Sequence, residues 1–163
     1  MRAILIDWLV EVHLKFKLVP ETLYLTVNLI DRYLEKEVVM REKLQLVGVT
    51  AMLVASKYEE IYAPEVQDFV YITDKAYTKE EILDQEYKML KILDFDTTTC
   101  SSYRFLLRYH KLSESDPFIV NMARYLLEIS LVDYKMLKHH PSLLAASALY
   151  LSQKIVKKPN CWP

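Results

Sequence analysis

The sequence contains a single glycine, Gly48, among 163 residues. One glycine cannot build a phosphate-binding P-loop, a dinucleotide-binding fingerprint or the glycine-rich loop of a protein kinase, because each needs several glycines at fixed spacing. Few glycines also mean few tight turns, which argues against a sandwich or barrel of short strands. The shortage therefore excludes the common nucleotide-binding enzymes and predicts an all-α fold.

An excess of one charge, a long apolar run and cysteine pairs are also missing. Lys and Arg number 21 against 22 acidic residues, so the net charge of -1 gives no basic field for nucleic acid or an anionic membrane. The longest nearly unbroken apolar run, Leu46 to Ala55, is about half of the roughly 20 residues that a membrane-spanning helix requires. Cys100 and Cys161 lack metal-site spacing, and no secretory leader is visible. We therefore expect an intracellular protein with neither nucleic acid nor membrane as a partner.

Catalytic and metal-binding constellations are absent as well. His139 and His140 are adjacent, so on a helix their side chains point about 100 degrees apart and do not converge on one ion. His13 and His110 are isolated, and the sequence has no nucleophile elbow, zinc-protease motif or paired catalytic carboxylates. We expect no catalytic residue, no metal site and no cofactor.

Apolar residues recur at helical spacing along most of the chain. The first three predicted helices span residues 1–17, 20–35 and 42–60, and the third is the most apolar. A short fourth helix is predicted at 65–71. Thr78 and Glu81 form a capping box, which opens a fifth helix that ends near residue 93.

The run from Thr97 to Thr99 interrupts this pattern, because β-branched residues favour extended backbone. We place a domain boundary there, with one domain at 1–96 and a second at 97–163. Helices are predicted in the second domain at 101–110, at 117–131 with Asp116 as its cap, and at 141–157.

A weak internal repeat relates the two domains. Small residues that let a neighbouring helix approach closely recur at the same spacing: Gly48, Ala51 and Ala55 in the first domain, and Ala145, Ala148 and Ser152 in the second. Each domain should then have its third helix at the centre. We expect a five-helix box followed by a second, truncated repeat, and chance similarity between two small-residue helices remains the alternative.

Two pairs of opposite charges interrupt apolar helix faces. Arg2 and Asp31 lie on the first and second helices, and we expect a structural ion pair between them. Lys57 and Glu86, on the third and fifth helices, have two interpretations: an internal salt bridge, or contacts with the backbone of a partner. In the second interpretation a groove is lined by Val54, Tyr58, Ile61, Leu90 and Phe95. Spacing alone does not choose between the two.

The first helix is apolar on nearly every side, and one face carries Met1, Ile4, Leu5 and Trp8. Core packing is the simplest interpretation of such a stripe. In a small domain, however, a helix that is apolar all round can leave part of its surface open. The alternative is therefore a docking patch on this face.

Four segments resemble the cyclin box of A- and B-type cyclins: MRAILIDWLVEVH, ETLYLTVNLIDRYL, KLQLVGVTAMLVASKYEEIY and YTKEEIL. Two later segments, YLLEISLVDYKML and PSLLAASALYLS, resemble the second cyclin fold of the same subfamily. MRAILIDW and LVDYKM favour the B-type. The resemblance implies a non-enzymatic subunit that binds and activates a cyclin-dependent kinase at G2/M, in the nucleus or the cytoplasm.

The resemblance also implies roles for the residues named above. In the family, the groove of the first box holds the PSTAIRE-type helix of the kinase, so Lys57 and Glu86 become its polar anchors and the five groove residues its apolar seat. The family's docking patch for arginine-x-leucine motifs of substrates or inhibitors maps to Met1, Ile4, Leu5, Trp8, Glu11, Leu44 and Gln45. Glu11 is expected to face the arginine of the motif, and the family's ion pair falls on Arg2 and Asp31.

One alternative comes from a different functional class, the cyclin-fold transcription factors that bridge polymerase and promoter DNA. Such a protein needs a basic surface toward DNA, and a net charge of -1 does not favour one.

Overall fold

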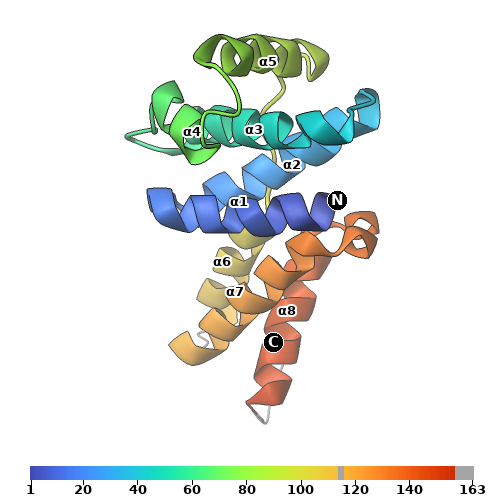
Figure 1. Cartoon of the computed structure of the whole chain (residues 1–163). Helices are drawn as coiled ribbons and strands as arrows, with labels where there is room; N and C mark the ends of the chain where they lie inside the picture. Colours follow the sequence, from blue (N-terminus) through green and yellow to red (C-terminus); the bar gives the residue numbers. More distant parts are fainter. Residues whose placement is uncertain (114–115, 157–163) are drawn as a thin grey trace. The chain divides into compact units, whose positions relative to one another are not determined.

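The computed structural model describes residues 1–113 and 116–156, and within these ranges every regular element is helical. The elements in chain order are α1 (Arg2–Phe16), α2 (Pro20–Lys36), η1 (Arg41–Lys43), α3 (Leu44–Glu59), α4 (Val66–Ile72), α5 (Lys79–Ile92), α6 (Ser102–Ser113), α7 (Pro117–Val132), η2 (Tyr134–Lys138) and α8 (Pro141–Ile155). The α-helices are labelled in Figure 1. The all-α prediction is confirmed, and each predicted helix has a counterpart. The 3₁₀ turn η2 was not predicted, because so short an element carries no apolar period. Cys161 and the predicted helix end at Lys157 lie outside the described residues.

The sequence signals at helix starts act as expected. Thr78 accepts a hydrogen bond from the Glu81 amide at 3.2 Å, and the Glu81 carboxylate accepts one from the Thr78 amide at 2.9 Å. The Asp116 carboxylate accepts from the Phe118 amide at 2.8 Å and caps α7. Both caps satisfy amides that have no partner within their own helix.

The chain divides into two compact units, Met1–Thr99 and Cys100–Pro163. In the first unit α3 is central, because it packs against α1, α2, α4 and α5 (Figure 1). Every residue of α3 from 46 to 56 is buried. Gly48 lies where α1 comes nearest: a Cβ atom there would be 2.8 Å from Cδ1 of Leu5. The lack of a side chain at Gly48 therefore lets α1 lie close to the central helix.

In the second unit α8 packs against both α6 and α7. The small residues of α8 that echo those of α3, namely Ala145, Ala148 and Ser152, are buried. The unit is thus organised around a helix with a small-residue face, as the first unit is organised around α3.

Candidate functional site: a charged pair, an apolar rim and a hollow

Lys57 and Glu86 form an ion pair between the last turn of α3 and the middle of α5. The Lys57 Nζ lies 2.7 and 2.8 Å from the two carboxylate oxygens of Glu86. The lysine side chain remains 48% exposed, whereas the glutamate side chain is only 12% exposed. An ammonium group has three N–H donors. The pair is therefore internal, and its lysine can still donate to the carbonyls of an approaching partner.

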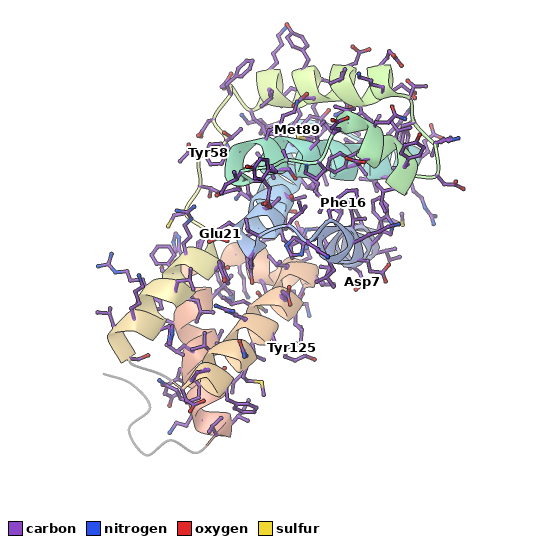
Figure 2. The ribbon with its side chains drawn as sticks, turned by 90° about the vertical axis from the view of Figure 1, so that its left-hand side faces the viewer. Asp7, Phe16, Glu21, Tyr58, Met89 and Tyr125 are labelled. Atoms are coloured by element: carbon purple, nitrogen blue, oxygen red, sulfur yellow. The ribbon has the colours of Figure 1, made fainter. Side chains whose placement is uncertain are left out.

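The apolar residues predicted around this pair divide into two groups. Tyr58, Ile61 and Phe95 are exposed, whereas Val54 is buried in the core and Leu90 packs partly buried against it. The Tyr58 hydroxyl lies 3.1 Å from Oγ1 of Thr98, so the end of α3 touches the segment that follows α5 (Figure 2). We call the three exposed residues the apolar rim; Tyr58 directly follows Lys57 on α3, and Val54 lies about one turn before Lys57.

Sequence reasoning missed three exposed apolar residues near this rim. Leu83 and Tyr87 lie on α5, one or two turns before Leu90, and Tyr62 follows Ile61 after the end of α3. The spacing of Leu83, Tyr87 and Leu90 places them on one face of a helix. That spacing was the available signal, although the charged residues between them obscured it.

The turn after α5 has an uncommon backbone. Asp94 and Phe95 have φ angles of 53° and 58°, in the left-handed region. Side chains other than glycine are strained there, at about 1–3 kcal/mol per residue, and a bulky side chain is a genuine outlier. The Phe95 amide donates to the Leu90 carbonyl at 2.8 Å, which closes the turn. The Phe95 ring is nevertheless 65% exposed. The strained backbone thus holds a large apolar ring in solvent.

Side chains of α2 and of Glu37, which follows it, contact α5 and the segment after it. Lys36 Nζ donates to the Ile92 carbonyl at 3.0 Å, and Arg32 Nη2 donates to Oδ2 of Asp96 at 3.2 Å. Lys88 of α5 lies 3.4 Å from Glu37, and its pKa is raised by Tyr33 and by the hydrogen bond to Glu37.

A hollow of about 190 Å³ opens between α1 and the start of α3. It is lined by six of the residues predicted for the docking patch, and by one residue that was not predicted: Met1, Ile4, Leu5, Trp8, Leu44 and Gln45, together with Arg41. Pockets for small molecules usually measure about 300–1,000 Å³. The hollow therefore suits a protein side chain better than a cofactor.

Two charged residues, Glu11 and Arg41, differ in their relation to the hollow. Glu11 is exposed on α1 but does not line the hollow, whereas Arg41 in η1 does. The position of Arg41 depends on how residues 37–43 fold back, which helical spacing does not predict. Gly48 shapes the same hollow indirectly, because its missing side chain leaves room for Leu5.

Arg2 and Asp31 join α1 to α2 through a bidentate contact. The Nε–Oδ1 distance is 2.6 Å and the Nη2–Oδ2 distance is 2.8 Å. The two side chains are only 15% and 17% exposed. Parallel bidentate hydrogen bonds between charged groups are among the strongest in proteins. This pair is a structural contact of the first unit.

The described residues contain no cluster of three His, Cys, Asp or Glu side chains placed to hold a metal ion. Nor does any described helix have the length and apolar character needed to cross a bilayer. What the first unit does present is an accessible charged pair with an apolar rim, and an apolar hollow. The first unit is thus a helical domain with two candidate binding surfaces.

Comparison with known proteins identifies the family. Residues 1–98 match the family described as "Cyclin, N-terminal domain" and residues 100–163 match "Cyclin, C-terminal domain". The chain belongs to the cyclin family. The resemblance to cyclins seen in the sequence is thus confirmed.

Relatives at 50–54% identity include several B-type cyclins. The chain is 54% identical to Cyclin-B2-1 of Oryza sativa subsp. japonica, over 99% of the chain and 39% of that protein. It is 52% identical to the G2/mitotic-specific cyclin-B of Hydra viridissima, over 100% of the chain and 42% of that protein. The chain therefore spans about two fifths of the length of these relatives.

A solved structure shares the fold of the chain. The X-ray structure of a viral cyclin from herpesvirus saimiri superposes with a TM-score of 0.88 at 25% identity, and the match covers 99% of this chain and 72% of the viral protein. This likeness agrees with the predicted fold class. The B-type relatives do not favour the transcription-factor alternative.

Proposed function

We propose that this chain is the kinase-binding part of a mitotic cyclin, a regulatory subunit that activates a cyclin-dependent kinase at G2/M. The observation that carries the proposal is the Lys57–Glu86 pair, which is held at 2.7 Å while half of the lysine remains exposed beside an apolar rim. The name of the Hydra relative, a G2/mitotic-specific cyclin-B, supports the timing. The protein would act in the nucleus, the cytoplasm or both.

The proposed mechanism is a population shift in the kinase. The kinase's PSTAIRE-type helix lies against the rim, with its apolar side chains on Tyr58, Ile61 and Phe95 and its backbone on Lys57 and Glu86. Bound there, it is held inward, so that its glutamate pairs with the lysine that orients ATP. All catalytic groups belong to the kinase, and this chain contributes binding free energy for one of the kinase's two states.

The hollow on α1 is the proposed docking site for substrates or inhibitors that carry arginine-x-leucine motifs. The leucine side chain would enter the hollow between Ile4, Leu5 and Trp8, which together present an apolar surface. Glu11 is exposed on α1, one turn beyond Trp8, where it would face the motif's arginine.

Mixing the protein with a purified cyclin-dependent kinase tests the main proposal. We expect a stable heterodimer on size-exclusion chromatography and ATP-dependent phosphorylation of histone by the complex. Absence of binding to every cyclin-dependent kinase tried would refute it. A gel-shift experiment with duplex DNA at physiological salt should show no complex, because tight binding would support the transcription-factor alternative.

The docking proposal predicts a specific effect of Ile4→Ala. Ile4 is exposed at the hollow, so its truncation should weaken binding of an arginine-x-leucine peptide about tenfold, since burying such a side chain contributes ~1.5–3 kcal/mol. Leu14→Ala is the matched control, because Leu14 is also exposed on α1 but does not line the hollow. Fluorescence anisotropy with a labelled peptide measures both. Equal peptide affinities for the two variants would show that the peptide does not bind in the hollow.

A further inference from the structure

The strained turn after α5 has a counterpart after α4. Asp74 and Lys75 have φ angles of 54° and 58°, nearly the same as those of Asp94 and Phe95. The hydrogen bonds also correspond, because the Lys75 amide donates to the Val70 carbonyl at 3.0 Å. In the turn after α4, the second left-handed residue is a lysine, whose charged side chain is well hydrated in solvent. The turn after α5 places a phenylalanine at that position.

The two turns differ in how they are held. Among the described residues, no side chain from another helix bonds to Asp74 or Lys75, and Lys75 only stacks on Tyr71 of α4 itself. The turn after α5, by contrast, is contacted on both sides of Phe95 by residues of α2.

Arg32 and Lys36 make these contacts from successive turns of α2. Lys36 Nζ donates to the Ile92 carbonyl at 3.0 Å, before the left-handed residues 94–95. Arg32 Nη2 donates to Oδ2 of Asp96 at 3.2 Å, just after them. The two donors are four residues apart and so lie on one face of α2. Farther along, Tyr58 contacts Thr98 at 3.1 Å. The segment from Ile92 to Thr98 thus makes hydrogen bonds with α2 and α3 on both sides of the exposed Phe95 ring.

We propose that Arg32 and Lys36 are positioning residues for kinase binding, which fix the turn of residues 92–96 so that the Phe95 ring is presented before the kinase arrives. This inference rests on the proposed function. The contacts from α2 would restrict the turn after α5 to the conformation that presents the Phe95 ring. Without them, the kinase would bind only the fraction of molecules in which Phe95 is correctly placed. Fastening the turn removes that loss, because apparent affinity is reduced by the fraction of molecules in the competent state.

The test is a double-mutant cycle between the two α2 residues and Phe95. The Arg32→Gln, Lys36→Gln variant should bind a cyclin-dependent kinase about tenfold more weakly than the wild type, a difference of ~1.4 kcal/mol. In a Phe95→Ala background the same two changes should have almost no further effect, because there is no ring left to position. Isothermal titration calorimetry measures the four dissociation constants. Additive effects, or an unchanged affinity of the first variant, would overturn the proposal.

Two further variants separate positioning from general loss of fold. Exchanging the charges, with Arg32→Asp and Asp96→Arg together, should restore most of the affinity that Arg32→Asp alone removes.

Lys43→Gln is the control, because Lys43 pairs with Glu81 at 3.7 Å on the exposed surface and does not contact the turn. Its affinity should equal that of the wild type, and an equal loss in this control would overturn the inference. If the wild type binds no kinase, the proposed function fails as well. If the wild type binds but the double-mutant cycle shows additive effects, only this inference fails and the proposed function stands.

Discussion

Replacing both Lys57 and Glu86 by alanine should weaken binding to a cyclin-dependent kinase by at least about 100-fold. Hydrogen bonds to charged groups contribute ~1.5–3 kcal/mol each when a partner is left unpaired, and the variant removes both anchors of the partner's backbone. The exposed apolar rim stays in place, so residual weak binding is expected. Calorimetric titration with purified kinase measures the loss.

Folding should survive this double change. The lysine is half exposed, and exposed ion pairs contribute only about 0–1 kcal/mol to stability. Lys57→Ala alone is the harsher variant for the fold, because it leaves the Glu86 carboxylate, which is 12% exposed, without its partner. A double variant with unchanged helical content and unchanged kinase affinity would show that the pair is purely structural, the first of the two interpretations drawn from the sequence.

Arg2→Ala should have the largest effect on stability, lowering the free energy of unfolding of the first unit by about 3 kcal/mol. The change leaves the Asp31 carboxylate, 17% exposed, without its bidentate partner between α1 and α2. Urea denaturation followed by circular dichroism measures the loss.

Two controls define what this loss means. Lys43→Ala breaks the exposed pair with Glu81 and should change stability by less than about 1 kcal/mol. Replacing both members of the inner pair by apolar residues, with Arg2→Met and Asp31→Leu together, should be milder than Arg2→Ala, because no charge is stranded. If Arg2→Ala were as mild as Lys43→Ala, the pair would not be the contact that joins the first two helices.

The helices were predictable from the sequence because their signals are local. Apolar spacing, the capping box of Thr78 and Glu81 and the Asp116 cap each act over a few residues. The central place of α3 also followed, because Gly48, Ala51 and Ala55 form a face that only a closely packed helix needs. The 3₁₀ turn η2 carries no such signal and was missed.

The site was only partly predictable, because it depends on how distant segments meet. The charges of Lys57 and Glu86 could be singled out, yet only the structure gives their 2.7 Å contact together with the exposure of the lysine. Arg41 reaches the hollow through the path of residues 37–43, which no periodicity encodes. The strained backbone at Phe95 was equally hidden, since an aromatic residue in the left-handed region is the exception.

The most direct test of the account is the rate of histone phosphorylation by a cyclin-dependent kinase with and without this protein. If the inward position of the kinase helix is about 1% populated in the free kinase, saturating amounts of the protein should raise the rate about 100-fold. At a concentration ten times the wild-type dissociation constant, the Lys57→Ala, Glu86→Ala variant should occupy at most about a tenth of the kinase and so give at most about a tenth of this rise. Tight binding of the wild type without any rise in the rate would contradict the claim that this chain activates a kinase.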